Sequence, residues 1–318
     1  MTDSPAIDAL DLRRTFHEVV AVDGVTLEVE RGAVFGLVGP DGAGKSTLIR
    51  LLATVLEPTS GDASIFGHSV TRDAQAVKSR IGYMSQRFSL YGDLTVAENL
   101  AFFAELRGVP RVERTERAKK LLEFSGLTEF SKRQARNLSG GMKQKLALAA
   151  TLIHEPDLLF LDEPTTGVDP VSRREFWRII SGLHRRGITV LVATPYMDEA
   201  ERCTEVAFMD AGRIVLRDTP AGIKRRVPGR LVEITVDDNR RAATLLATMD
   251  HVTGVEPYGD VLYVLVDCEQ PCEEDLAKGL ADAGLAVARI SPAAMTMEVA
   301  FSRLISGSSV APVTGGAT

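Results

Sequence analysis

The sequence of 318 residues predicts an α/β domain followed by a small α+β domain. Two observations predict the first domain. Short apolar runs alternate with helical patterns up to about residue 220, and one of these runs ends in a glycine-rich turn that leads into a helix. A third observation predicts the second domain, since the patterns beyond residue 230 follow a β-α-β-β-α-β order. We expect the domains to cover residues 1–222 and 230–306.

The first domain is expected to contain short buried strands and a helical insertion. The strand-like segments are Val25–Val29, Ala33–Val38, Leu158–Leu161 and Thr189–Ala193. Thr47–Val55 has the spacing of a helix, with leucines three and four residues apart. Residues 88–150 are charge-rich and helical in pattern, without strong strand signals. This stretch predicts a helical subdomain within the α/β core.

The second domain needs one weak strand to complete its pattern. Strands are expected at Leu231–Val236, Val261–Val266 and Ala286–Ile290, and helices at Arg240–Met249, Cys272–Ala283 and Met295–Ile305. The β-α-β-β-α-β order holds if Thr253–Pro257 supplies a further strand. The basic segment Ile223–Gly229 is expected to be a linker, and the Gly-, Ser- and Thr-rich tail 307–318 to be disordered.

Composition limits the classes of function. Hydrophobic residues make up 45% and charged residues 25%, and the net charge is −6, so nothing favours nucleic acid as a partner. No apolar run reaches the roughly 18 residues of a membrane helix, and the N-terminus lacks the pattern of a secretory signal. Cys203, Cys268 and Cys272 are too few for a disulfide framework, and no neighbouring His or Cys completes a metal site. We expect a structural or incidental role for all three and a reducing compartment.

A phosphate-binding loop is predicted where the strand Ala33–Val38 meets the following helix. The loop reads Gly39-Pro40-Asp41-Gly42-Ala43-Gly44-Lys45-Ser46, which fits G-x-x-x-x-G-K-[ST], and Thr47 continues the binding set. Glycines let backbone N–H groups point at phosphate oxygens, and the helix directs its positive end at the same anion. Lys45 supplies a charge for the β- and γ-phosphates, and the Ser46 hydroxyl suits Mg²⁺. Asp41 is expected to weaken binding unless its side chain points away.

Two acids end the apolar run Leu158–Leu161. Asp162 and Glu163 would lie at the carboxyl end of a buried parallel strand, where α/β sheets place their ligand chemistry. Asp162 would hold Mg²⁺, directly or through water. Glu163 would orient and polarise the attacking water, because phosphoryl transfer depends on positioning and electrostatics.

A second anion site carries the resemblance to a known family. The segment Leu138-Ser139-Gly140-Gly141-Met142-Lys143-Gln144 resembles the LSGGQ-type signature of ABC ATPases. Ser139 and the backbone of Gly140 and Gly141, at the start of the predicted helix Met142–Thr151, can bind a γ-phosphate. In the family this segment closes over ATP held by the other subunit. The resemblance therefore implies a head-to-tail dimer with two shared sites.

Further positions match the family in the expected order along residues 8–220. Gln86 matches the glutamine that senses Mg²⁺ and the attacking water, and Asp169 matches an aspartate that bridges the dimer. Leu90–Asn99 looks like the part that meets the membrane subunit. Phe16 lies where the family stacks an aromatic side chain on adenine, although core packing explains this residue as well. Leu138–Lys145 and Tyr196–Glu201 look most like the ATPases of drug exporters.

The resemblance implies a P-loop NTPase of the ABC cassette type, with a RecA-like α/β core, a helical subdomain and an antiparallel β subdomain. It implies binding of ATP and Mg²⁺, and hydrolysis coupled to export of drugs or other small molecules by an ABC-2-like system. The expected partners are separately encoded membrane permease subunits and a second cassette, most simply another copy, at the cytoplasmic face of the membrane. The second domain resembles the accessory region that follows some exporter cassettes, and a small-ligand sensor is an alternative.

One departure from the family leaves alternatives open. Pro195 stands where the family usually has a histidine that contacts the γ-phosphate, and proline has neither a side-chain donor nor a backbone N–H. A weakly hydrolysing or non-hydrolysing regulatory cassette is therefore an alternative. Another is a soluble ABC ATPase of DNA repair or translation. Against it, residues 45–138 hold no heptad array and the chain has a single cassette.

Overall fold

The computed structural model of this chain describes residues 4–86, 90–268 and 272–306. These residues form two compact units, of which the first ends at Pro220 and the second begins at Ala221. The tail 307–318, for which we predicted disorder, lies outside the described residues. Across the described ranges, no helix combines the length and the apolar character that crossing a bilayer requires.

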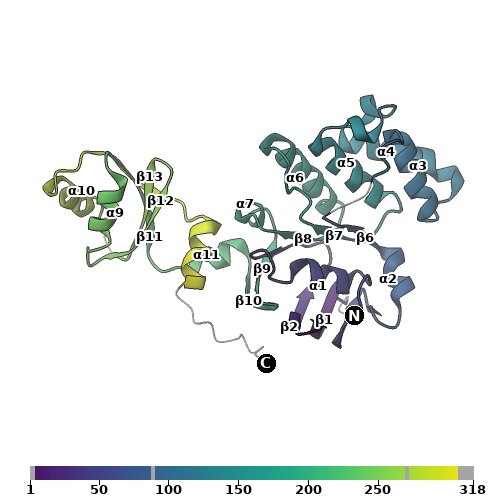
Figure 1. Ribbon diagram of the computed structural model, residues 1–318, viewed down its shortest axis with the longest axis horizontal. Coiled ribbons are helices and arrows are strands. Elements are labelled where there is room, and N and C mark those ends of the chain that lie inside the picture. Colours follow the sequence, from purple (N-terminus) through teal and green to yellow (C-terminus); the bar gives the residue numbers. More distant parts are fainter. Residues whose placement is uncertain (1–3, 87–89, 269–271, 307–318) are drawn as a thin grey trace. The chain divides into compact units, whose positions relative to one another are not determined.

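A six-stranded sheet forms the centre of the first unit, in the order β10-β9-β3-β8-β7-β6 (Figure 1). The strands are β3 (Val34–Val38), β6 (Ile81–Met84), β7 (Leu158–Asp162), β8 (Thr189–Thr194), β9 (Glu205–Asp210) and β10 (Arg213–Asp218). All pair in parallel except β10, which is antiparallel to β9. Every residue of β3, β7 and β8 is buried, which explains their unbroken apolar sequences. Because parallel strands end at one edge, the segments after β3, β6, β7 and β8 meet there.

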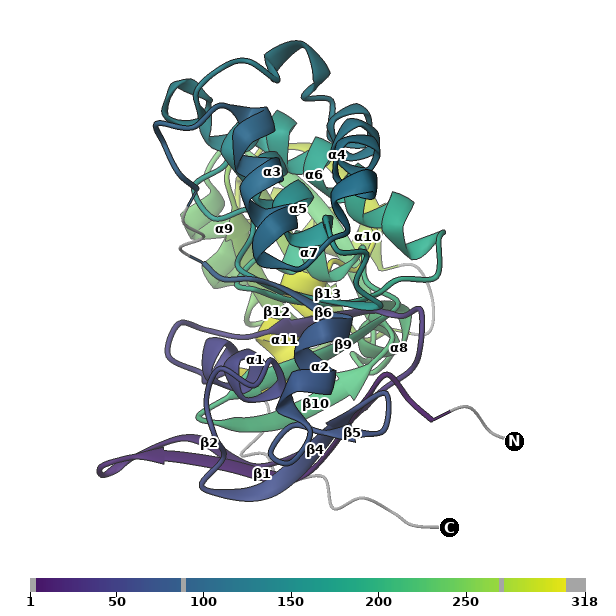
Figure 2. The same cartoon turned by 90° about the vertical axis from the view of Figure 1, so that its right-hand side faces the viewer.

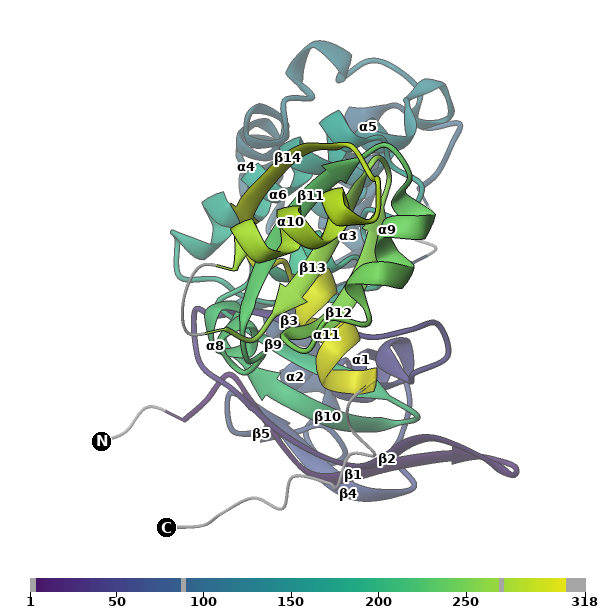
Figure 3. The same ribbon diagram turned by 90° about the vertical axis from the view of Figure 1, so that its left-hand side faces the viewer.

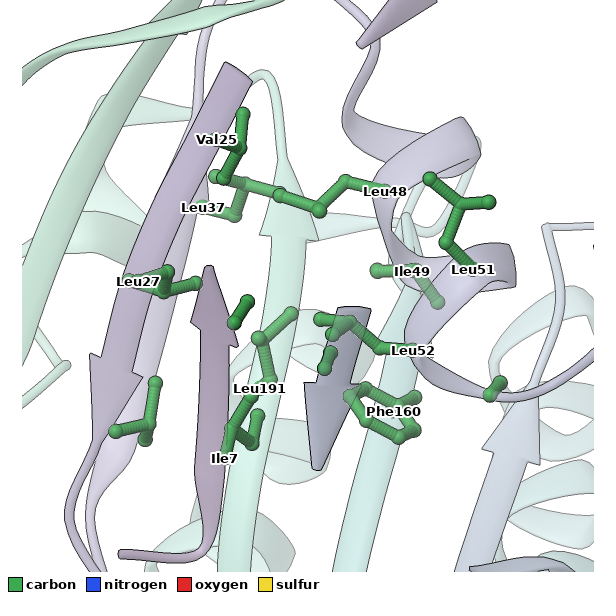
Figure 4. Close-up of a cluster of buried hydrophobic side chains, with 14 of the residues drawn as sticks. Ile7, Val25, Leu27, Leu37, Leu48, Ile49, Leu51, Leu52, Phe160 and Leu191 are labelled. Atoms are coloured by element: carbon green, nitrogen blue, oxygen red, sulfur yellow. The ribbon is translucent and has the colours of Figure 1, made fainter. Parts of the chain in front are cut away.

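An antiparallel sheet and helix α1 complete the main core. The sheet has the order β2-β1-β4-β5 and consists of β1 (Ile7–Phe16), β2 (Val19–Val29), β4 (Ser60–Ile65) and β5 (His68–Ser69). Helix α1 (Lys45–Leu52) contacts strands of both sheets, and α2 (Ala74–Arg80) leads into β6. Figure 4 shows Leu48 and Leu52 directed from α1 towards the strands that carry Leu37 and Phe160. The start of α1, which follows the glycine-rich loop, is thereby fixed against the parallel sheet.

The predicted helical insertion is confirmed as a cluster of helices with its own apolar core. It comprises α3 (Val96–Leu106), α4 (Arg111–Ser125) and α5 (Gly140–Leu152), which lie together at the top of Figure 2. Thr95 and Glu98 form a capping box that starts α3, and Gly126, with a φ of 67°, ends α4. Helix α6 (Pro170–His184) follows β7 and packs beside α5.

The second unit has the predicted β-α-β-β-α-β order, followed by a final helix. Its elements are β11 (Arg230–Val236), α9 (Asn239–Leu246), β12 (Val252–Tyr258), β13 (Val261–Val266), α10 (Glu273–Asp282), β14 (Val287–Ala293) and α11 (Met297–Ser306). The sheet is antiparallel in the order β12-β13-β11-β14. Helices α9 and α10 pack on the same face of it, as Figure 3 shows. The weak strand expected at Thr253–Pro257 is thus confirmed.

Two expectations need correction. The segment 223–229 is not wholly a linker, because α8 (Pro220–Arg225) covers its first part and Ile223 is buried. Pro220 favours this helix start, where its fixed φ fits and its missing N–H costs nothing. The structure also joins Cys268 and Cys272 in a disulfide, although we expected no disulfide framework. Cys268 lies after β13, and Cys272 directly precedes the first residue of α10.

Candidate nucleotide site

The glycine-rich loop begins directly after β3, and its last two residues, Lys45 and Ser46, are the first two residues of α1. Gly39 and Gly44 have φ values of 153° and 101°. A Cβ atom would meet the carbonyl oxygen of Met209 at Gly39 and that of Ala21 at Gly44. Neighbouring backbone therefore packs so closely against the loop that only glycine fits at either position.

A cavity of about 300 Å³ lies against this loop. Its lining comprises Val19, Val20, Ala21, Asp41, Gly42, Ala43, Gly44, Lys45, Ser46, Thr47, Glu163, Ala211 and Gly212. The predicted residues 41–47 and Glu163 are therefore brought together, and Asp41 lies in the site rather than apart from it. We did not predict from the sequence that Val19–Ala21 and Ala211–Gly212 line this cavity. The sequence at Asp210-Ala211-Gly212 signals a turn, but nothing in it tells where that turn packs.

Lys45 is held by the loop in which it lies. Its Nζ donates to the carbonyl oxygens of Gly39 (2.7 Å) and Pro40 (2.9 Å), and only 4% of the residue is exposed. Burial lowers the pKa of Lys45, against the opposing effect of the negative charges of Glu163 and Asp41 and, more weakly, Asp162. The ammonium group is thus placed where an anion would replace its backbone partners.

Asp162 offers a carboxylate oxygen without a partner. Ser46 Oγ donates to Asp162 Oδ1 at 2.7 Å, while Asp162 Oδ2 is buried and has no hydrogen-bond partner in the described chain. Burial raises the pKa of Asp162, and the hydrogen bond from Ser46 opposes that shift. A buried hydroxyl–carboxylate pair with a free oxygen fits a hard cation such as Mg²⁺, which prefers oxygen ligands.

Gln86 and Glu163, which we assigned separate roles from the sequence, are joined by a hydrogen bond. Gln86 Nε2 donates to Glu163 Oε2 at 2.9 Å, and Thr166 Oγ1 donates to the same oxygen at 3.2 Å. The backbone N–H of Glu163 donates to the carbonyl oxygen of Ala193 in β8 at 2.9 Å. Glu163 has a φ of 49°, which is an unusual backbone conformation for a residue other than glycine. Such strained conformations are common at functional sites, where they fix the direction of a side chain.

The signature residues lie outside the cavity of their own chain. Ser139 caps α5, where its Oγ accepts from the N–H of Met142 at 3.2 Å, and a Cβ at Gly140 would meet no atom within 4 Å. Gly141 is required by packing instead, since a Cβ there would meet the Ser172 side chain of α6. Residues 139–141 are thus an open helix start that can receive an anion from outside the chain.

Asp169 and Phe16 also lie away from the cavity lining. Asp169 caps α6 by accepting from the N–H groups of Val171 (3.1 Å) and Ser172 (3.0 Å). Hydrogen bonds from Ser172 lower the pKa of Asp169. Phe16 ends β1 with 36% exposure, and the guanidinium of Arg14 stacks on its ring at 4.6 Å. The dimer bridge by Asp169 and the adenine contact by Phe16 stay predictions.

Four strand ends therefore supply one site. The segment after β3 forms the anion-binding loop, and the segment after β6 brings Gln86. The end of β7 supplies Asp162 and Glu163, and β8 fixes the backbone of Glu163. The fold and the site together define a P-loop nucleotide-binding protein.

Comparison with known proteins places the chain within that class. Residues 22–166 match the family described as ABC transporter. The probable multidrug ABC transporter ATP-binding protein YbhF of Escherichia coli (strain K12) is 43% identical over 218 residues, which cover 69% of this chain and 38% of that protein. The daunorubicin resistance ATP-binding protein DrrA3 of Streptomyces coeruleorubidus is 34% identical over 302 residues, which cover 94% of this chain and 95% of that one.

A solved structure agrees with this result. The structure of cbiO1 from Clostridium perfringens, part of the ABC transporter complex cbiONQ, has a TM-score of 0.64 at 27% identity and covers 70% of this chain and 94% of that one. The chain spans less than half the length of the E. coli relative but nearly all of the Streptomyces one, and it belongs to the family of ABC transporter ATP-binding proteins.

Proposed function

We propose that this chain binds and hydrolyses ATP to drive a separate membrane permease that exports drugs or other small molecules. The observation that carries hydrolysis is the Glu163 carboxylate, held by Gln86 at the wall of the loop cavity. The relatives support export, since the E. coli protein is named as a multidrug transporter component and the Streptomyces protein as a daunorubicin resistance component. The proposed location is the cytoplasmic face of the membrane.

The residues divide the reaction between them. Backbone N–H groups of residues 39–46 and the Lys45 ammonium bind the phosphates, with Lys45 exchanging two carbonyl partners for phosphate oxygens. Ser46 and Asp162, with Gln86, would hold Mg²⁺, which neutralises charge on the phosphate oxygens. Glu163 orients a water whose oxygen bonds to the γ-phosphorus while the bond to the bridging oxygen of ADP breaks. The proton of that water passes to the Glu163 carboxylate.

The complete site needs a second cassette. Residues 139–141 present a helix start with open space at Gly140, and they do not line the cavity of their own chain. Two copies arranged head to tail would place each signature over the phosphates held by the other loop. Asp169 and Phe16 then lie beside the bound nucleotide, where they contact the partner copy and the adenine.

The variant Glu163→Gln tests hydrolysis. It keeps the size of the side chain but removes the proton acceptor, so we expect phosphate release at saturating ATP to fall about 10²–10⁴-fold while ATP binding persists. Glu274→Gln, an exposed change on α10, is the matched control and should leave the rate unchanged. A wild-type chain that releases no phosphate, or a variant as fast as wild type, would contradict the proposal.

A second candidate function rests on Pro195. This residue follows β8 at the edge that carries the site and supplies no hydrogen-bond donor there. A nucleotide-gated regulatory cassette that binds ATP without turnover would fit such a site. The same assay separates the two functions, because a regulatory cassette releases no phosphate before any substitution is made.

A further inference from the structure

A buried carboxylate lies beside the site, in the segment Tyr196–Glu201, and no step of the proposed reaction uses it. Glu199 is on the short helix α7 (Met197–Ala200) and is fully buried. A buried carboxylate is tolerated only when its oxygens are paired, because its desolvation is costly. Both oxygens are paired here. Thr165 Oγ1 donates to Oε1 at 2.5 Å, and Thr194 Oγ1 donates to Oε2 at 2.7 Å.

The two threonines come from the two segments that flank the reacting end of the site. Thr165 lies two residues after Glu163, on the segment that follows β7. Thr194 is the last residue of β8, directly before Pro195. Each is about 1% exposed, so water does not replace either hydrogen bond. Glu199 therefore joins the backbone beside Glu163 to the backbone beside Pro195.

The hydrogen bonds continue across Pro195. Thr194 Oγ1, which donates to Glu199, also accepts from the N–H of Tyr196 at 3.1 Å. This relay spans the proline and fixes the turn that it makes. The hydroxyl has one proton to donate, so its direction, and with it the acceptance from Tyr196, depends on the carboxylate.

Helix α6 supplies the compensating charge. Arg173 Nε lies 3.7 Å from Glu199 Oε1, and its guanidinium stacks on the ring of Tyr196 at 4.1 Å. The same arginine lies 3.7 Å from Asp198, whose side chain is 56% exposed. Asp198 thus faces the same positive charge without touching either threonine, which makes it a matched control.

We propose that Glu199 is a positioning residue for ATP hydrolysis, an inference that rests on the proposed function. Through Thr165 it fixes the segment that carries Glu163, and through Thr194 it fixes the turn at Pro195. Glu199 does not touch the substrate. Its role is to hold the water-orienting carboxylate of Glu163 and the end of β8 in a fixed relative position. This matters because Pro195, which follows β8, donates no hydrogen bond to the nucleotide.

The variant Glu199→Gln in the full chain tests this role. The amide replaces one of the two carboxylate oxygens by an NH2 group, so one threonine hydroxyl loses its acceptor and its hydrogen bond must be broken or reversed. We expect kcat for phosphate release to fall about tenfold or more, because small displacements of catalytic groups are costly, while the KM for ATP stays within about twofold of wild type. Asp198→Asn should leave both constants unchanged.

A second pair of variants keeps the test decisive if Glu199→Gln is poorly folded. Thr194→Val removes the hydroxyl and should lower kcat, whereas Thr194→Ser retains it and should restore the wild-type rate. The losses of Thr194→Val and Glu199→Gln should not add in the double variant, since both break one relay.

The possible outcomes separate the two proposals. A wild-type chain without ATPase activity contradicts the proposed function itself. An active wild type with unchanged kcat in Glu199→Gln and Thr194→Val overturns the positioning role alone. A rise in KM with no fall in kcat overturns it as well, because the network would then serve ATP binding.

Discussion

Two buried charges of opposite sign meet at the phosphate site, and neither is fully satisfied without a ligand. The Lys45 ammonium donates hydrogen bonds to two loop carbonyls, and Asp162 has one oxygen with no partner in the described chain. Burial disfavours the ionised form of each, so it lowers the pKa of Lys45 and raises that of Asp162. An incoming phosphate and a cation relieve both deficits together. Lys45 and Asp162 are thus positioned for a phosphate and a cation before either ligand binds.

Pro195 gives a prediction at the scale of one residue. Replacing it by histidine restores a side-chain donor at the end of β8, where the family contacts the γ-phosphate. We expect Pro195→His to raise kcat about tenfold or more, since one well-placed donor to developing negative charge has a large effect on the rate. Phosphate release at saturating ATP measures this.

Pro195→Ala is the control, because it removes the ring and adds a backbone N–H without a side-chain donor. The alanine variant should gain much less than the histidine variant. A histidine variant with an unchanged or lower rate would contradict our account of this position.

His154 joins two elements and gives a prediction at that scale. It follows α5, its Nε2 lies 2.9 Å from the carbonyl oxygen of Ile81 in β6, and its Nδ1 is buried without a partner in the described residues. Burial lowers the pKa of His154 from the ordinary 6.5, although the bond to Ile81 opposes the shift. The unfolded chain therefore takes up this proton first as the pH falls. Stability present above about pH 6.5 is lost below it.

We expect the free energy of unfolding in urea to decline between pH 6.5 and 5.5, and His154→Gln to reduce that decline. Glutamine places an N–H near the position of Nε2 and carries no titrating group. Urea titrations of both proteins at pH 7.5, 6.5 and 5.5 provide the measurement. Equal slopes with pH in the two proteins would show that His154 does not couple α5 to β6 in this way.

Elements with a strong local pattern could be predicted from the sequence, and those set by distant contacts could not. The buried strands β7 and β8 are continuous apolar runs, and the phosphate loop is recognised from a motif of consecutive residues. By contrast, α8 depends on a proline and a single buried isoleucine within a basic stretch. The segment Tyr196–Glu201 resembles the family, but the role proposed for Glu199 could not be predicted from it, because that role depends on Thr165, 34 residues away. The cavity walls from β2 and the β9–β10 turn likewise depend on tertiary packing.

The whole molecule contains separate cores, which predicts separate unfolding. One core joins α1 to strands of the first unit, and another lies between α9, α10 and the sheet of the second unit. We expect calorimetry to resolve two transitions, and Mg²⁺ with a non-hydrolysable ATP analogue to raise the Tm of the larger one alone. At a ligand concentration of 100 times Kd the added stability is about 2.7 kcal/mol.

A chain carrying Lys45→Ala is the control in that measurement and should show no shift with the analogue. A single transition, or an equal shift of both, would show that the two units unfold as one cooperative body.

The open helix start at residues 139–141 has a genetic consequence under the proposed head-to-tail pairing. Each protomer contributes a phosphate loop to one ATP site of the dimer and a signature segment to the other. A mutation in one protomer therefore affects a site that is shared with its partner. Consider a dimer of one copy with an inactive phosphate loop and one copy with an inactive signature. Both defects would fall in the same ATP site, and the other site would be intact. Two dead alleles could thereby restore partial activity to each other.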